Sequence, residues 1–221
     1  MNDTYAIQPP VYFPDLTYCA LMSSVDCFVV GENFQYSRQS FQNRAHVRSP
    51  DGAQWLTVPL IGGQHSLPIS ETQIDYAFHW QAKHLKALRF NYGSTPFYKH
   101  YIDQVSRVIV TEHDSLAALT VASVALVHEL LGLGCALENK GFNGFRKRRS
   151  TTRTQHLFDS DINRNNSNES DRRILSYKHP VYRQNFDGFV DGMFVLDLLF
   201  SHGPEAPRIL RSGISFGEVE D

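Results

Sequence analysis

The first thirty residues contain short apolar stretches separated by residues that favour turns. This pattern is typical of short secondary-structure elements. Prolines in residues 7–14 remove backbone donors and favour extended geometry. Asp15 can then cap a short helix that runs to about residue 24. The apolar run over residues 25–30 has the length and β-branched content of a buried strand. The pattern therefore predicts an extended segment, a short helix and a strand in succession.

Two further strands are predicted over residues 45–48 and 55–60. The sequence Pro50-Asp51-Gly52 lies between them. Proline, aspartate and glycine are the residues that tight turns favour. We therefore expect these two strands to pair as a hairpin.

After Gly62-Gly63 the apolar residues recur at the spacing of a helix, and three helices are predicted. Apolar and aromatic side chains recur every four residues from Trp80 to Tyr92, as on one face of a helix. A second helix is expected to begin with Thr95 as its N-cap and Pro96 at its first position. The third spans residues 114–131 and ends at a glycine. These helices should form one half of the molecule.

The last third of the chain is divided between a polar segment and one apolar element. Residues 143–173 have almost no apolar periodicity, so a mobile polar loop is expected there. The apolar signal returns over residues 192–200, which should form the last core helix, and residues 211–221 are predicted to be a loose tail. At 221 residues, 42% of them hydrophobic, the chain fits a single domain over residues 1–221. We expect an α/β fold with a short mixed central sheet flanked by helices.

Charge and composition narrow the function classes. The net charge of −2 gives no overall attraction to nucleic acid, and the basic residues 146–149 are followed by acidic ones, so no nucleic-acid partner is expected. The N-terminus lacks the pattern of a signal peptide, and no apolar run approaches the roughly 18 residues of a spanning helix. We therefore expect a cytoplasmic protein without membrane insertion.

Short motifs that suggest an enzyme class fail on their spacing. His128-Glu129 begins a zinc motif, but Gly132 stands where the second histidine is needed. The three cysteines have no C-x-x-C spacing, so no metal site is predicted. Residues 213–217 spell G-x-S-x-G, but only four residues follow, which leaves no room for the partners of a hydrolase serine. Walker and G-x-G-x-x-G sequences are absent, and no particular cofactor is indicated.

A polar constellation near the N-terminus survives these exclusions. If the first two strands are neighbours, their carboxyl ends would bring its members to one crevice, where open α/β sheets bind ligands. Each member also has a structural interpretation, such as a core ring, a turn residue or a surface ion pair. The residues concerned are Gln8, Tyr12, Glu32, Gln35, Tyr36, Asn43 and Arg44.

Two isolated polar residues in predicted helices are further candidates. His84 lies one turn after Trp80 on the same helical face, where a histidine is either a hydrogen-bonded core group or a proton-transfer group. Asp197 stands among apolar neighbours in VLDLLF and must find donors or shift its pKa. Such a carboxyl either caps a buried loop or serves a site.

The order of several motifs resembles the WbqC-like protein family over about residues 7–210. The resemblance is carried by Gln8-Pro9-x-x-Tyr12-x-Pro14, residues 28–36, Phe41-Gln42-Asn43-Arg44, W-L-x-V-P at residues 55–59, Trp80, His84, Tyr92, residues 94–98, Tyr182-x-Gln184-x-Phe186, residues 196–200 and Gly203-Pro204-Glu205. This family is known chiefly from genes for O-antigen and related surface glycans. The resemblance adds Tyr98, Tyr182 and Gln184 to Asp197 and the N-terminal constellation as candidate substrate-binding residues.

The resemblance implies work in bacterial surface-polysaccharide biosynthesis. We expect a group transferase, for acyl, aminoacyl or similar groups, that acts on an activated sugar and binds a small-molecule substrate such as a sugar nucleotide. Arg44 and Asn43 would hold its anionic group, because a guanidinium suits phosphate geometry. His84 or Glu32 would transfer the proton. The alternative is a non-catalytic accessory protein that binds a partner enzyme.

Overall fold

A pair of parallel strands forms the centre of the main sheet. The computed structural model describes residues 4–140, 163–164 and 173–218. Strand β1 (Thr4–Gln8) pairs in parallel with β2 (Cys27–Gly31), and β2 pairs in parallel with β5 (Ala136–Lys140). Strand β6 (Asn163–Arg164) adds an antiparallel edge beside β1. The predicted α/β class and short mixed sheet are confirmed.

The connection from β1 to β2 contains the predicted short helix, α1 (Leu16–Met22). Its N-cap is Asp15, whose carboxylate accepts a hydrogen bond of 2.8 Å from the backbone N–H of Tyr18. Phe13, before the helix, has a φ of 44°, which side chains with a Cβ rarely adopt. Strands β1 and β2 are neighbours in the sheet, as the predicted crevice at their carboxyl ends requires.

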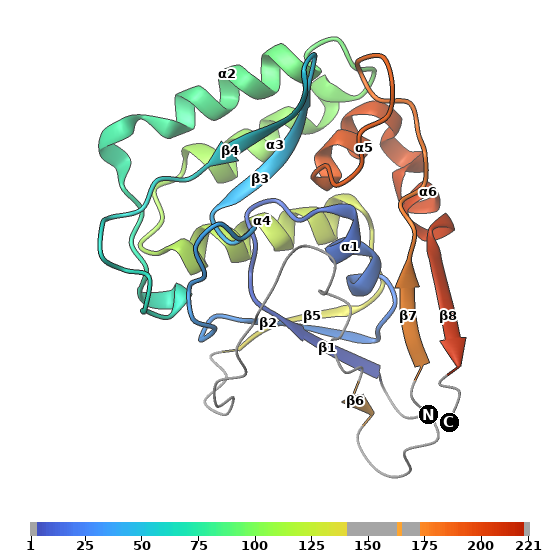
Figure 1. Cartoon of the computed structure of the whole chain (residues 1–221), viewed down its shortest axis with the longest axis horizontal. Coiled ribbons are helices and arrows are strands. Elements are labelled where there is room, and N and C mark those ends of the chain that lie inside the picture. Colours follow the sequence, from blue (N-terminus) through green and yellow to red (C-terminus); the bar gives the residue numbers. More distant parts are fainter. Residues whose placement is uncertain (1–3, 141–162, 165–172, 219–221) are drawn as a thin grey trace.

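The predicted hairpin is confirmed as β3 (Arg44–Ser49) and β4 (Gly52–Thr57). Gly52 supplies the turn with a φ of 114°, which only glycine adopts without strain. The hairpin lies beside α2 (Trp80–Tyr92), above the main sheet in Figure 1.

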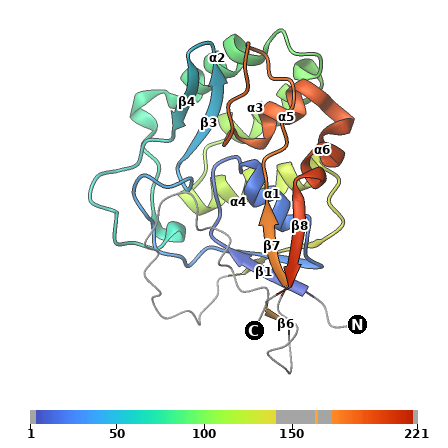
Figure 2. The same ribbon diagram turned by 45° about the vertical axis from the view of Figure 1, so that its right-hand side comes forward.

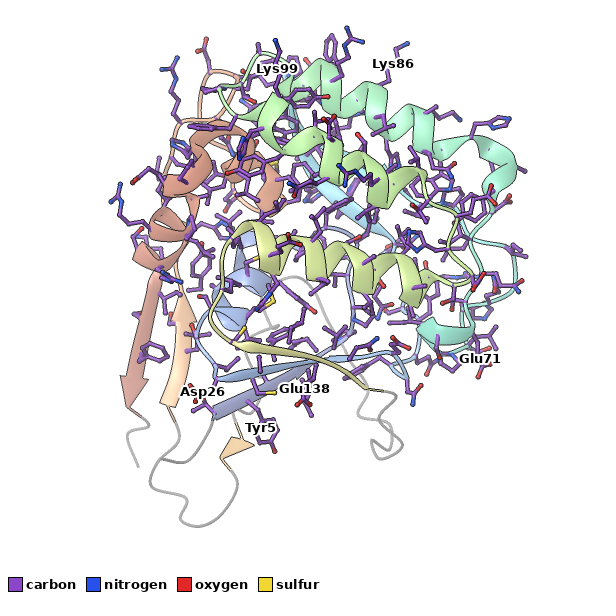
Figure 3. All side chains as sticks on the ribbon, turned by 180° about the vertical axis from the view of Figure 1, so that it is seen from behind. Tyr5, Asp26, Glu71, Lys86, Lys99 and Glu138 are labelled. Atoms are coloured by element: carbon purple, nitrogen blue, oxygen red, sulfur yellow. The ribbon has the colours of Figure 1, made fainter. Side chains whose placement is uncertain are left out.

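Helices α3 (Tyr98–Val110) and α4 (Leu116–Leu130) complete the helical half. Figure 3 shows α4 between α3 and the main sheet, which explains why α4 is apolar on nearly all sides. Helix α3 does not begin at the predicted N-cap. The hydroxyl of Thr95 instead donates to the carbonyl of Tyr92 at 2.7 Å, and Phe97 precedes the first helical residue.

Short 3-10 helices complete the connections. Those in the described part of the chain are η1 (Ile69–Glu71) and η2 (Tyr76–Phe78), before α2, and η4 (Gly203–Glu205), which directly follows α5 (Val195–His202).

The C-terminal part forms two helices and a second small sheet. Helix α5 (Val195–His202) is the predicted last core helix, and α6 (Ala206–Ser212) follows it. Strands β7 (Arg173–Tyr177) and β8 (Ile214–Glu218) pair antiparallel and lie side by side in Figure 2.

Two predictions about irregular segments meet different outcomes. The loose tail predicted for residues 211–221 is corrected for residues 211–218, because residues 211 and 212 belong to α6 and residues 214–218 pair with β7. Most of the predicted mobile loop, residues 143–162 and 165–172, lies outside the described residues. Within the described part of the chain, no helix has both the length and the apolar character that crossing a bilayer requires.

Candidate functional site

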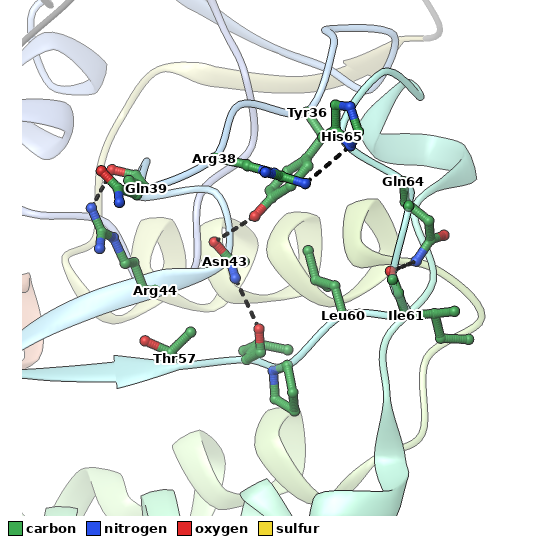
Figure 4. A pocket seen from close by; sticks show the side chains of 14 residues that line it. Tyr36, Arg38, Gln39, Asn43, Arg44, Thr57, Leu60, Ile61, Gln64 and His65 are labelled. Carbon is green, nitrogen blue, oxygen red and sulfur yellow. Dashed lines mark hydrogen bonds between the residues drawn. The ribbon is translucent and has the colours of Figure 1, made fainter.

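A pocket of about 480 Å³ opens beside the hairpin. One wall comes from the loop that leads into β3, through Tyr36, Arg38, Gln39, Asn43 and Arg44. The other wall is the continuous run from Thr57 to His65, after the end of β4 (Figure 4). The volume lies in the range of small-molecule sites.

Two guanidinium groups make this pocket suitable for an anion. Among the described residues, its lining includes Arg38 and Arg44 but no aspartate or glutamate. Burial raises the pKa of the Tyr36 phenol, whereas the charges of Arg38 and Arg44 act in the opposite direction. Both cations are therefore close enough to Tyr36 to act on one group. A guanidinium presents several N–H donors in a plane and binds phosphate or carboxylate oxygens well.

Arg44 is held on two sides. Its Nη2 donates to the backbone carbonyl of Gln39, and its guanidinium carbon lies 3.9 Å from the ring centroid of Trp55. Gln39 has a φ of 57°, in the left-handed region that costs energy for a residue with a Cβ. The Nε of Arg44 is buried and has no hydrogen-bond partner within the described residues.

Asn43 braces the pocket and does not offer a free amide. Its Nδ2 donates to the carbonyl of Val58 at 2.9 Å, and its Oδ1 accepts from the Tyr36 hydroxyl at 3.2 Å. The backbone N–H of Val58 donates in return to the Asn43 carbonyl at 2.7 Å. Asn43 therefore fixes the two walls and orients Tyr36, whose oxygen can still accept a hydrogen bond.

Arg38 joins the walls at the other end of the pocket. Its Nη2 lies 3.1 Å from Nδ1 of His65 (Figure 4). A guanidinium can only donate, so Nδ1 accepts and a neutral His65 ring carries its proton on Nε2. His65 is thus an ionisable side chain within the pocket, between the arginines and the Gly62-Gly63 turn.

The predicted proton-transfer residue His84 lies outside this pocket. Its Nε2 is 3.2 Å from the carbonyl of Thr57, which can only accept, so Nδ1 accepts from the Tyr12 hydroxyl at 2.9 Å. Burial lowers the pKa of His84 to about 4, and the ring is neutral at pH 7. His84 and Tyr12 therefore tie α2 and β4 to the turn after β1. The expectation that this imidazole shares one cavity with Asn43 and Arg44 does not agree with the structure.

Three other members of the N-terminal constellation are also absent from the lining. Gln8 is buried at the end of β1, opposite Val30. The backbone carbonyl of Glu32 accepts from Ser70, and Gln35 is exposed beside Pro68. The structure thus brings together Tyr36, Asn43 and Arg44 and separates them from Gln8, Tyr12, Glu32 and Gln35.

The C-terminal candidates form a separate, buried cluster. The hydroxyl of Tyr182 donates to Oδ2 of Asp197 at 2.7 Å, and Nε2 of Gln184 donates to the same oxygen at 3.1 Å. Gln184 also bonds both backbone polar groups of Val190, at 2.8 and 2.9 Å. Burial raises the pKa of Asp197, against the effect of its hydrogen bonds. This cluster fastens the segment before α5 to that helix. Tyr98 packs apart from it, with its ring 5.3 Å from that of Phe200.

Sequence reasoning missed three residues of the pocket region. Arg38 and His65 lie in polar turns without periodicity, and their contact joins positions 27 residues apart. Trp55 is one of several exposed residues of β4, and the sequence does not indicate its contact with Arg44. The available signal was the Gly62-Gly63 turn, because glycines allow a backbone to approach a ligand closely.

Comparisons with known proteins agree with the resemblance seen in the motifs. The model of the WbqC-like protein family matches residues 8–159 and 144–209. A protein of Mycobacterium tuberculosis, "Uncharacterized protein Rv1507c", is 28% identical over 224 residues, which cover 93% of this chain and 96% of that protein. No solved structure matches the chain. Because the family match runs through both walls of the pocket and the cluster around Asp197, the chain belongs to the WbqC-like protein family.

Proposed function

We propose that the protein is a group transferase of bacterial surface-polysaccharide biosynthesis and that it holds the phosphate of an activated sugar between Arg38 and Arg44. The observation that carries the proposal is a pocket whose described lining residues supply two guanidinium groups and no carboxylate. A phosphate-bearing sugar supplies the negative charge that such a lining attracts. The pocket volume suits a small molecule.

Proton transfer in this proposal belongs to His65. His84 uses both ring nitrogens in buried hydrogen bonds, and Glu32 does not line the pocket. His65 lines it and keeps one ring nitrogen free of the bond to Arg38. In the neutral ring Nδ1 accepts from Arg38 and Nε2 carries the hydrogen, so His65 accepts a substrate proton at Nδ1 once Arg38 has turned to the anion. An imidazole is suited to such proton transfer near neutral pH.

Ligand-dependent thermal unfolding tests this proposal. Sugar nucleotides at about 100 times their Kd should stabilise the native state by about 2.7 kcal/mol, which raises the Tm by about 5–10 °C for a chain of this size. Arg44→Ala should weaken binding about 10- to 100-fold, because it removes a charge-assisted contact. Without ligand this variant should unfold close to the wild-type Tm.

The matched control is Arg208→Ala. Arg208 is an exposed arginine on α6 that pairs with Glu205 at 2.7 Å, and it does not line the pocket. Its variant should bind like the wild type. A wild-type Tm that no sugar nucleotide, acyl-coenzyme A or ATP changes would contradict the proposal and favour an accessory protein that binds a partner enzyme.

A further inference from the structure

Trp55 stands against the guanidinium of Arg44 on the outer face of the hairpin. The guanidinium carbon is 3.9 Å from the indole centroid, and the His46 ring centroid is 3.4 Å from the same indole. Arg44 and His46 are two positions apart on β3, so they share a face at a spacing of about 7 Å. Trp55 faces His46 across the register of β3 and β4. The indole of Trp55 therefore contacts both the guanidinium of Arg44 and the imidazole of His46 on this face of the hairpin.

Arg44 differs from Arg38 in how firmly it is held. Arg44 is half-buried, with the indole against its plane and the carbonyl of Gln39 at one nitrogen. Arg38 is exposed, and its guanidinium donates to His65. An arginine side chain loses considerable rotamer entropy when it is fixed on a ligand. The contacts of Arg44 already restrict its side chain without ligand, so Arg44 loses little further rotamer entropy when the ligand binds.

We infer that Trp55, backed by His46, is a positioning residue that holds the Arg44 guanidinium in place for the phosphate of the ligand. This inference rests on the proposed function, because it needs an anion in the pocket. The indole attracts the cation through its ring face and adds no charge that would compete with phosphate. A carboxylate in its place would hold Arg44 equally well but would neutralise the pocket.

Pyrophosphate titration of two Trp55 variants tests the inference. Trp55→Leu should weaken pyrophosphate binding about tenfold by calorimetry, because the guanidinium loses its stacking partner. Trp55→Phe should recover most of the affinity, since a phenyl ring keeps an aromatic face. The control is Phe90→Leu, which removes an aromatic side chain that is 72% exposed on α2 and is absent from the pocket lining. It should bind pyrophosphate like the wild type.

Indole fluorescence gives a second readout that a purely structural role would not change. The chain has two tryptophans, and Trp80 is buried with no hydrogen-bond partner for its N–H among the described residues, so Trp80→Phe leaves no described partner unsatisfied. In that background the emission comes from Trp55 alone. Pyrophosphate should change its intensity or wavelength as Arg44 engages the anion. Arg44→Lys should remove most of this response, because an ammonium lacks the stacked plane.

The outcomes separate the inference from the proposed function. If the wild type binds neither pyrophosphate nor a sugar nucleotide, the proposed function falls and the inference falls with it. If the wild type binds pyrophosphate and Trp55→Leu binds it equally well, only the positioning role of Trp55 is overturned. Should Trp55→Leu fail to fold, the affinity of Trp55→Phe and the fluorescence response decide. An unchanged Trp55 emission in a protein saturated with pyrophosphate would then overturn the inference.

Discussion

Asp15 and His84 are ionisable side chains that the fold buries on either side of the turn between β1 and α1. Burial raises the pKa of Asp15 to about 6 from 3.8, although the backbone N–H groups of Tyr18 and Thr17 act in the opposite direction. Burial lowers the pKa of His84 to about 4 from 6.5. The two shifts have opposite consequences for stability, because each is a difference in proton binding between the folded and unfolded states.

Acidification affects the two groups with opposite sign. Between pH 6.5 and 4 the unfolded chain binds a proton at His84 that the folded protein excludes, so this group destabilises the fold as pH falls. Between pH 6 and 3.8 the folded protein holds a proton at Asp15 that the unfolded chain releases, so this group stabilises the fold as pH falls. Each group changes the free energy of unfolding by about 3 kcal/mol over its pH range. In the wild type the two changes largely cancel.

Asp15→Asn should expose the contribution of His84. Asparagine keeps the N-cap oxygen that Tyr18 uses but removes the titrating group. The free energy of unfolding of the variant should therefore fall by about 3 kcal/mol from pH 7 to pH 4, measured by urea denaturation, while that of the wild type changes less. Asp75→Asn is the control, since Asp75 also caps a short helix but is less buried. Parallel profiles for Asp15→Asn and the wild type would refute this account.

The buried cluster around Asp197 joins helix α5 to the segment before it. The carboxyl is fully buried, and one of its oxygens accepts from Tyr182 and Gln184, which lie before the helix in the chain. Tyr182→Phe should lower the free energy of unfolding by about 1–3 kcal/mol in urea denaturation, because a buried acceptor loses its shortest bond. Pyrophosphate affinity should stay unchanged, since the cluster does not line the pocket.

A double-mutant cycle gives the control for this cluster. Tyr182→Phe should cost less in an Asp197→Leu background, where no carboxylate is left unsatisfied. Tyr98→Phe should be nearly neutral, because the Tyr98 ring, which contacts Phe200, is retained. Equal costs of Tyr182→Phe in both backgrounds would mean that the bond to Asp197 does not stabilise α5.

Strong local patterns predicted most of the elements. The spacing of Trp80 to Tyr92 and the Pro50-Asp51-Gly52 turn correspond to α2 and to the β3–β4 hairpin. The missed strands are short and read as ALENK, RILSY and ISFGE, without clear alternation. Their hydrogen bonds come from partners far along the chain, as between β7 and β8, so the local sequence carries little information about them.

The candidate site was likewise predictable where its residues are close in the sequence and not where tertiary packing decides. Tyr36, Asn43 and Arg44 were predicted together because they are close in sequence and follow a strand, and they do line one pocket. The prediction for His84 rests on helical periodicity and on the family resemblance. That periodicity indicates which face of α2 is buried but not that Thr57 and Tyr12 occupy both ring nitrogens. The partners of a polar side chain are decided by tertiary packing, which a single sequence does not reveal.

The protein as a unit is mildly acidic, with a formal net charge of −2, so its overall field does not draw an anion from a distance. Among the described residues, the cations that line the pocket are Arg38 and Arg44, and we expect the attraction for phosphate to come from them at contact range. Contact interactions are screened less than those beyond the Debye length, which is about 8–10 Å near physiological salt. Affinity for pyrophosphate should therefore respond more to competing anions than to ionic strength itself.

Matched salts test this local attraction. At equal ionic strength, sulfate should weaken pyrophosphate binding several-fold more than chloride in calorimetric titrations, because its oxygens can occupy the same guanidinium donors as phosphate. Arg38→Ala should reduce the difference between the salts, since a single guanidinium remains. The Tm of the free protein should barely change with sodium chloride, because exposed pairs such as Arg208 with Glu205 contribute little to stability. If chloride and sulfate weaken binding equally at matched ionic strength, the ligand is held by diffuse charge and not by the two arginines of the pocket.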